Sequence, residues 1–410
     1  MQVRKTAKMF WIQITLSGIF FLFLACRSTK TITNTESNQP AIKTFQLFPL
    51  SHTTNHLTPL QGLSGLAFDK ESEDEYYFWS LTDRGPNLDP LPSARVPLRP
   101  FLEPKFSPRI YYFSISKKDG GSKLLKTIVL KDEFNHPILG LPPASQCYSE
   151  EIPIDSKGLH LNCQKYGIDS ESIAIDDRGH FWIGEEYGPS IFEFTPDGKL
   201  QSVISSRSTS RKNRGKMVIP ILPNIVSKRK VNRGFEAIAI KNKILFAMLQ
   251  SPLPNIKNNA ESSYIPIFKI DLEKKQLLST LWYPTDNGMD LKIGDITFEN
   301  DNSLLVLEQT TEMGKNSIHN IYRVAINQNL DTEQGHPNEE VFLKKELVLD
   351  LVKEGFDQFQ KIEGLTYVQG LGIAVVNDND FSVGGLTNEP SPTVLGLFTT
   401  NRKLWKNKGN

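Results

Sequence analysis

The chain has 410 residues, of which 39% are hydrophobic and 23% charged, and this composition excludes collagen-like, coiled-coil and disordered classes. Its 47 Lys and Arg residues nearly balance its 46 Asp and Glu residues, so the basic excess typical of a nucleic-acid binder is missing and we expect no nucleic-acid partner. Three cysteines are too few for a disulfide scaffold. The length allows one large β domain or several smaller domains.

The first 25 residues read as a leader. Basic residues at positions 4, 5 and 8 precede a largely apolar stretch that ends in Ala25 and Cys26. This ending resembles a bacterial lipobox, in which the chain is cleaved before the cysteine and lipid is attached to its sulfur. We predict a lipoprotein signal peptide over residues 1–25, lipidation of Cys26 and a polar tether over residues 26–40, with a plain membrane anchor as the alternative. The predicted location is the bacterial cell envelope, lipid-anchored to a membrane and either periplasmic or surface-exposed.

Export changes how the other two cysteines are interpreted. With Cys26 lipidated, Cys147 and Cys163 remain as a pair in an oxidising compartment. The segment around them has few strand signals. We predict a disulfide between them, and two separate thiols are the alternative.

From residue 41 onward, β-branched and aromatic runs alternate with Gly, Pro, Asn and Asp, and long helical periodicity is scarce. Five segments share one pattern, in which a polar or acidic residue precedes an alternating apolar strand. These segments are GLSGLAFD (62–69), DSESIAID (169–176), GFEAIAI (234–240), IGDITFEN (293–300) and IEGLTYVQ (362–369). Each is followed, after a turn, by a second apolar strand that ends in polar groups.

A four-stranded unit that recurs about every 60–70 residues is typical of a β-propeller. We therefore predict one all-β propeller domain over residues 41–410, with five legible repeats. The first interval, from Ser64 to Glu171, is longer than the others and leaves room for a sixth blade or for an insertion near residues 132–167. A strand over residues 44–50 is predicted to complete the last blade and close the ring. A two-domain α/β enzyme would need amphipathic helices between the strands, and these are missing.

Equivalent positions of the repeats predict a metal site. The first strand of each propeller blade lines the central channel, so residues at equivalent positions converge. The predicted equivalents are mostly acidic and include Glu171, Glu236, Asp295 and Glu363. Such carboxylates repel one another unless a cation neutralises them, and their oxygens suit hard divalent ions. We predict that these four acids bind one divalent cation, with Ca²⁺ favoured over Mg²⁺ or Mn²⁺. The alternative is that they cap strand ends or pair with neighbouring bases.

The catalytic candidates lie close to these repeats. Arg84 follows the second strand of the first repeat and is predicted to bind an anion, while Asp83 or Glu185 is predicted to act as general base. Arg233 and Lys292 each precede a predicted ring acid by three residues and are further candidates for holding a phosphate or carboxylate. The sequence shows no G-x-S-x-G elbow, no P-loop and no histidine in a fixed relation to the repeats.

The ordered motifs resemble one known family. The pairs are GLSGL with TDRGPN, DSESIAID with WIGEEYGP, FEAIA with LQSPL, and KIEGL with NDNDF. Together they resemble the bacterial phytase-like family, also called "esterase-like activity of phytase", over Gly62 to Phe381. The resemblance implies a β-propeller and hydrolysis of ester or phosphoester bonds. The clearest departures are Asn- and Lys-rich loops and the Ser that follows Phe381, where family members often carry Gly.

The leading hypothesis is an exported, lipid-anchored, metal-dependent phosphoesterase or esterase that acts on a small molecule, and we expect a monomer. Two alternatives stay open at this point, so the sequence does not decide whether the protein is an enzyme. One is a non-catalytic propeller that binds a ligand or a protein and holds a structural cation. The other is a calcium-dependent lactonase of the six-bladed type.

Overall fold

The computed structural model covers the chain from the predicted propeller onward, apart from several internal gaps. The described residues are 41–46, 60–93, 95–206, 217–253, 263–286, 291–310, 312–326, 342–383 and 392–399. The predicted leader and tether, with Cys26, lie outside them. Among the described residues, no helix is both long enough and apolar enough to cross a membrane.

Five sheets of the described residues form the blades. Blade 1 comprises β2 (Leu63–Glu71), β3 (Glu75–Thr82), β5 (Arg109–Ser116) and β6 (Ser122–Val129). Blade 2 comprises β8 (Ser170–Ile175), β9 (Phe181–Glu185), β10 (Ser190–Phe194), β11 (Leu200–Ser206) and β12 (Val218–Leu222). Blade 3 comprises β13 (Phe235–Lys241), β14 (Ile244–Leu249), β15 (Tyr264–Asp271) and β16 (Gln276–Pro284).

The remaining strands complete the ring. Blade 4 comprises β17 (Lys292–Asn300), β18 (Ser303–Gln309), β19 (His319–Ala325) and β20 (Lys345–Asp350). Blade 5 comprises β21 (Lys361–Val368), β22 (Gly372–Asp378), β23 (Val394–Thr399) and β1 (Ala41–Gln46). In the described part of the chain, three short 3-10 helices lie between strands: η1 (Asn224–Lys228), η3 (Phe356–Gln358) and η4 (Asp380–Ser382).

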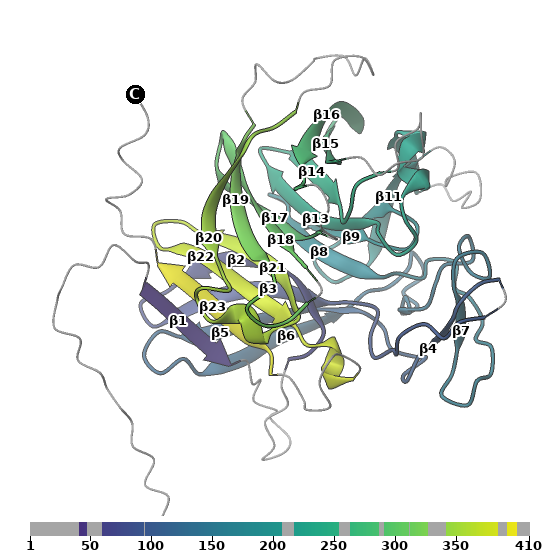
Figure 1. The fold of residues 1–410 in the computed structure, drawn as a ribbon. Helices are drawn as coiled ribbons and strands as arrows, with labels where there is room; N and C mark the ends of the chain where they lie inside the picture. The colour runs from purple at the N-terminus through teal and green to yellow at the C-terminus, as the bar shows by residue number, and fades with distance from the viewer. Residues whose placement is uncertain are drawn as a thin grey trace, which may run out of the picture. The chain divides into compact units, whose positions relative to one another are not determined.

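The arrangement is a closed five-bladed propeller, which confirms the predicted fold class. The first strands β2, β8, β13, β17 and β21 contact one another in cyclic order, and Figure 1 shows them gathered at the centre. Neighbouring strands within a blade are antiparallel, except that β12 pairs parallel with β11. The described residues hold five blades, so the long first interval does not contain a sixth.

Burial explains why the inner strands read as apolar runs. All residues of β8 but the last are buried, because this strand packs against neighbouring blades on both faces. The outer strand β6 exposes several residues instead. Aromatic side chains join adjacent blades: the rings of Trp79 and Phe181 lie 5.1 Å apart, and those of Phe246 and Phe298 lie 5.4 Å apart. Edge-to-face contacts of this kind stabilise the packing between blades.

The first and last described strands close the ring, as the sequence predicted. Strand β1 pairs antiparallel with β23, with Ala41 opposite Thr399 and Gln46 opposite Val394 (Figure 1). The closing strand therefore begins at residue 41 rather than at the predicted residue 44, and the predicted residues 47–50 lie outside the described residues. Blade 5 is thus built from both ends of the described chain.

The long first interval contains an insertion, one of the two outcomes that the sequence left open. Strands β4 (Leu98–Pro100) and β7 (Ile152–Ile154) form a small parallel sheet outside the blades. Arg99 and Glu151 form a buried ion pair between the two inserted segments. Cys147 and Cys163 are joined by a disulfide, with their Cα atoms 6.2 Å apart. The insertion therefore has its own cross-links.

Candidate functional site

Every blade carries a one-residue bulge near the start of its innermost strand. In blade 3, Phe235 pairs with Leu249 and Ala237 pairs with Met248, so Glu236 has no partner on β14. The same slip occurs in the other four blades. In chain order, the bulged residues are Gly65, Glu171, Glu236, Gly294 and Glu363. Because a bulge re-aims the side chain that it carries, these five residues are the true equivalents around the axis.

Asp295 is not one of these equivalents, although it was predicted as a ring acid. It follows the bulged Gly294, and its carboxylate accepts hydrogen bonds from the backbone N–H groups of Ile296 and Leu365, both at 2.8 Å. A Cβ atom at Gly294 would lie 2.4 Å from the carbonyl oxygen of Ile362, so blade 4 has no room for a bulged acid. The predicted set of four acids is therefore corrected to three.

A charged cavity of about 280 Å³ lies at the inner strands. Its acidic lining residues are Asp83, Asp89, Glu171, Glu186, Glu363 and Asp380. Its basic lining residues are Arg84, Arg99, Arg233, Lys292 and Lys361. The other lining residues are Asn87, Leu88, Asn232, Gln250, Gln360 and Val383. The cavity is therefore suited to ions and polar ligands rather than to apolar ones.

Three buried oxygen atoms at this cavity accept no hydrogen bond from the described residues. They are Glu186 Oε1, Glu236 Oε2 and Gln250 Oε1. Glu236 lies beside the lining rather than in it, and it is 1% exposed. A buried polar atom without a partner costs free energy, so these oxygens mark the place where a cation or a hydrogen-bond donor would be favourable.

The cavity carboxylates raise one another's pKa values. Burial, followed by the charge of Glu186, raises the pKa of Glu236 well above its usual range. Burial, followed by the charge of Asp169, does the same for Glu171. Burial and Asp169 also raise the pKa values of Glu186 and Asp83 to about 8. Clusters of buried groups with raised pKa values are common at functional sites, and a bound cation would favour the ionised forms.

Asp83 and Arg84 line the cavity, next to the end of β3. The Arg84 Nη1 atom lies 2.9 Å from Asp169 Oδ2, and it donates hydrogen bonds to Asn232 Oδ1 at 3.0 Å and to the Tyr187 hydroxyl at 3.3 Å. The charge of Arg84 is therefore already balanced by a carboxylate. The structure brings both residues to the cavity that their sequence position suggested.

Glu185 lies outside the cavity lining. Its carboxylate accepts hydrogen bonds from the backbone N–H groups of Tyr187 and Gly188, both at 2.8 Å, and burial raises its pKa to about 8. The next residue, Glu186, lines the cavity instead. Strand β9 ends at Glu185, so strand alternation does not decide which of the two acids faces the axis.

A group of three aspartates lies at another part of the wall. Carboxylate oxygens of Asp83, Asp378 and Asp380 lie within 4.8 Å of one another. The Lys361 Nζ atom lies 3.2 Å from Asp378 Oδ2 and 2.6 Å from Asp380 Oδ1. Lys361 thus balances part of the charge of this group.

Sequence reasoning missed two residues: Asp169, which pairs with the lining residue Arg84, and Gln250, which lines the cavity itself. Asp169 stands two residues before the bulged Glu171, and it is completely buried. Lys292 and Lys361 occupy the same position before the bulges of blades 4 and 5. Aligning the repeats on the bulge, rather than on the first acidic residue, would have revealed this charged position.

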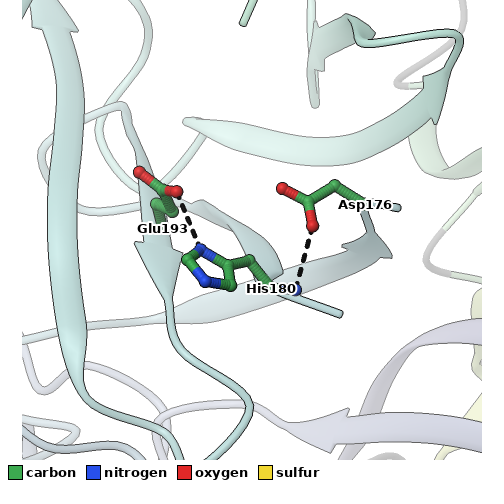
Figure 2. A group of neighbouring side chains, drawn as sticks. All are labelled: Asp176, His180 and Glu193. Atoms are coloured by element: carbon green, nitrogen blue, oxygen red, sulfur yellow. Dashed lines mark hydrogen bonds and ion pairs between the residues drawn. The ribbon is translucent and has the colours of Figure 1, made fainter. Parts of the chain in front are cut away.

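A second acidic cluster lies on blade 2, away from the cavity lining. Figure 2 shows Asp176, His180 and Glu193, with His180 Nδ1 2.9 Å from Glu193 Oε1. Asp176 accepts backbone hydrogen bonds from Arg178 and His180 and a side-chain hydrogen bond from Trp182. The Ser202 hydroxyl donates a hydrogen bond to Glu193 Oε2 at 2.6 Å. All carboxylate oxygens of this cluster therefore have protein partners, which suits a brace for the β8–β9 turn.

The fold and its axial cavity define a five-bladed β-propeller with a charged central site. The chain belongs to the phytase-like family, described as "Esterase-like activity of phytase", whose model matches residues 58–381. This match confirms the resemblance seen in the motifs.

Individual similar proteins are more distant. An "Uncharacterized secreted protein" of Arthroderma benhamiae is 26% identical over 219 residues, which cover 46% of this chain and 43% of that protein. The chain therefore matches less than half of the length of this relative. Among solved structures, a PQQ-bound aldose sugar dehydrogenase from Streptomyces coelicolor has a TM-score of 0.38 at 11% identity, covering 88% of this chain and 99% of that one. A virginiamycin B lyase from Staphylococcus aureus has a TM-score of 0.34 at 13% identity, covering 88% and 99%. Scores this low carry no argument about function.

Proposed function

We propose that this protein is an exported, lipid-anchored hydrolase that uses a divalent cation to cleave an ester or phosphoester bond of a small molecule. The observation that carries the proposal is the set of unpartnered buried oxygens of Glu186, Glu236 and Gln250 at a cavity that also holds basic side chains. Family membership supports an esterase-like activity. We expect the protein to act as a monomer.

The donor set fits a hard divalent ion. Carboxylate and amide oxygens are the ligands that Ca²⁺ prefers, and Mg²⁺ and Mn²⁺ accept them as well. We propose that Glu171, Glu236 and Glu363 hold the ion, with Gln250 and Glu186 beside them. When bound, such an ion polarises an ester and lowers the pKa of a coordinated water.

The chain's own residues supply the remaining chemistry in this proposal. Asp83 transfers a proton, because it lines the cavity and because burial and Asp169 raise its pKa to about 8, close to neutral pH. Arg84 adds positive charge to the wall and, through its hydrogen bond, orients Asn232. Glu185 holds the turn that carries Glu186, rather than acting as the base.

The cation dependence is tested by a substrate screen. The full-length protein, purified in detergent, is assayed with phosphoester, carboxyl-ester and lactone substrates, in EDTA and then with Ca²⁺, Mg²⁺ or Mn²⁺. The proposal expects cation-dependent hydrolysis of a phosphoester or carboxyl ester. Hydrolysis restricted to lactones would favour the lactonase alternative. Cation binding that raises the melting temperature, without hydrolysis of any substrate, would favour a binding propeller with a structural ion.

The proposed anchor is tested at Cys26. The Ala25-Cys26 ending motivates it, and the secreted relative is consistent with export. In a bacterial host, Cys26→Ser should leave an uncleaved precursor and abolish fatty-acid labelling, whereas Cys147→Ser should retain the label. Labelling that survives Cys26→Ser would exclude lipidation at this cysteine.

A further inference from the structure

We propose that Arg233 and Lys292 form an anion-binding subsite that takes the phosphate or carboxylate group of the substrate. The inference deepens the proposed function and rests on it for the identity of the ligand as a substrate. Binding of an anion to the subsite does not itself require hydrolysis, so the two ideas fail separately.

The corrected repeat register shows that charge is distributed unevenly around the axis. Two residues before the bulge, blade 2 carries Asp169, whereas blade 4 carries Lys292 and blade 5 carries Lys361. Blade 4 also has Gly294 where blades 2, 3 and 5 have a glutamate, and it has no room for a larger residue there. Lys292 therefore has no carboxylate at the bulge of its own blade to balance it.

Three of the five basic lining residues are already paired with carboxylates. Arg84 pairs with Asp169, Arg99 with Glu151, and Lys361 with Asp378 and Asp380. Lys292 forms no ion pair within the described part of the chain, although it lines the cavity. Among the described residues, the carboxylate that pairs with Arg233 is that of Glu186, with Nη1 and Oε1 4.0 Å apart, which is beyond hydrogen-bond distance. The same Nη1 atom donates a hydrogen bond to the carbonyl of Asn232 at 2.8 Å, which leaves the other guanidinium donors. These two side chains keep donors available for a ligand.

Arg233 and Lys292 also act on each other. Both side chains line the same cavity. Burial, followed by the positive charge of Arg233, lowers the pKa of Lys292. Like charges held together in a partly buried site are relieved by an anion between them. The planar guanidinium offers paired donors and the ammonium offers a compact charge, a combination that suits an oxyanion.

The neighbouring acids do not prevent this binding. The charges of Glu363 and Glu236 also reach Lys292. In the proposed site these acids are neutralised by the divalent cation, and the two bases are then free to hold the anionic group. The subsite and the proposed cation site thus share a single cavity of about 280 Å³, which limits the ligand to a small molecule or to the anionic end of a larger one.

The subsite is tested by binding rather than by turnover. Calorimetry with the full-length protein in detergent measures the Kd for inorganic phosphate and, separately, for acetate, in EDTA and then with Mg²⁺. Arg233→Gln and Lys292→Gln should each raise the Kd of the preferred anion about tenfold or more, because each removes a charge-assisted contact. Arg233→Lys and Lys292→Arg should recover most of the affinity. Lys274→Gln removes an exposed charge on blade 3 and serves as the matched control. Near-ultraviolet circular dichroism checks that each variant is folded.

The outcomes separate the possibilities. Weakened anion binding in both Gln variants, without hydrolysis by any form, would support the subsite and overturn only the hydrolase. The subsite would be overturned if neither anion binds the unmodified protein, or if the folded Gln variants bind as tightly as it does. A loss confined to Arg84→Gln would also overturn it and return the anion site to Arg84. Preference for phosphate over acetate assigns the subsite to phosphoesters, and the reverse assigns it to carboxylates.

Discussion

The axial cavity and the Asp176–His180–Glu193 cluster both gather acidic side chains, but they differ in how the acids are paired. In the cluster, both oxygens of Asp176 and of Glu193 accept hydrogen bonds. At the cavity, Glu186 and Glu236 each keep one buried oxygen without a partner. Proximity of acids is therefore weak evidence for a metal site, whereas an unpaired buried oxygen is stronger evidence.

The pairing also sets opposite pKa directions in the two regions. Burial raises the pKa values of Glu186 and Glu236. In the cluster, burial acts in the same upward direction, but hydrogen bonds outweigh it and lower the pKa values of Asp176 and Glu193. The surroundings thus favour the protonated forms of Glu186 and Glu236 and the ionised forms of Asp176 and Glu193.

The largest difference is expected when the same substitution is made in both regions. Glu236→Gln removes one charge from the proposed ligand set and keeps the side-chain size, so the affinity for Ca²⁺ should fall at least about tenfold and any hydrolysis about a hundredfold. Glu193→Gln, the matched control, should leave both unchanged. Calorimetry and the substrate assay measure the two effects. Equal losses in the two variants would show that the cavity acids have no special role.

The response of stability to pH should distinguish the regions next. The buried acids Asp83, Glu185 and Glu186 have ordinary pKa values of 3.8 to 4.5 and folded values of about 8. Asp83 and Glu186 line the cavity, and Glu185 directly precedes Glu186 in the chain. A raised acid pKa stabilises the fold below the unfolded value and loses that contribution as pH rises through the folded value. The melting temperature of metal-free protein should therefore fall between about pH 4.5 and 8, by on the order of 5 °C.

A saturating divalent cation should reduce that fall, because it favours the ionised acids. The cluster contributes with the opposite sign, since its lowered pKa values stabilise the fold above their ordinary range and are lost in acid. Scanning calorimetry at several pH values, with and without Ca²⁺, measures the melting temperature in both pH ranges. A melting temperature that rises from pH 5 to 8 in EDTA would contradict the raised pKa values of these buried acids.

The smallest effect is expected within the cluster. Glu193→Gln should lower the free energy of unfolding by about 1 kcal/mol, because its ion-pair partner Arg178 is 55% exposed and solvent screens the interaction. Urea unfolding measures this value, and Arg178→Gln in a double-mutant cycle isolates the pair. A loss several times larger, or any change in cation affinity, would mean that the cluster does more than brace a turn.

The repeats made most of the fold predictable. Alternating apolar runs at regular intervals indicated the propeller, and three of the four predicted ring acids occupy equivalent bulges. The number of blades was left open because the insertion lengthens the first interval without adding a blade. Composition and spacing do not separate these cases, since both add loop and short-strand residues.

The site was less predictable, for reasons of backbone geometry. Aligning acids placed Asp295 in the ring, but the bulge of blade 4 falls on Gly294, where the carbonyl of Ile362 leaves no space for a side chain. Glu185 and Glu186 are adjacent at a strand end, so only the path of the turn decides which one lines the cavity. A one-residue shift of this kind cannot be seen in the sequence alone, because it is defined by which residues of the neighbouring strand are paired.

The pairing of Ala41 with Thr399 has a consequence for how the molecule folds. Blade 5 needs strands from both ends of the described chain, so its last sheet cannot assemble until the C-terminal strand has been made. Contacts between residues so far apart close late and slowly, because a long loop must lose its entropy first. Until β1 and β23 pair with each other, both present exposed strand edges, which are prone to pair with other chains. The newly made protein is therefore most vulnerable to aggregation just before its ring closes.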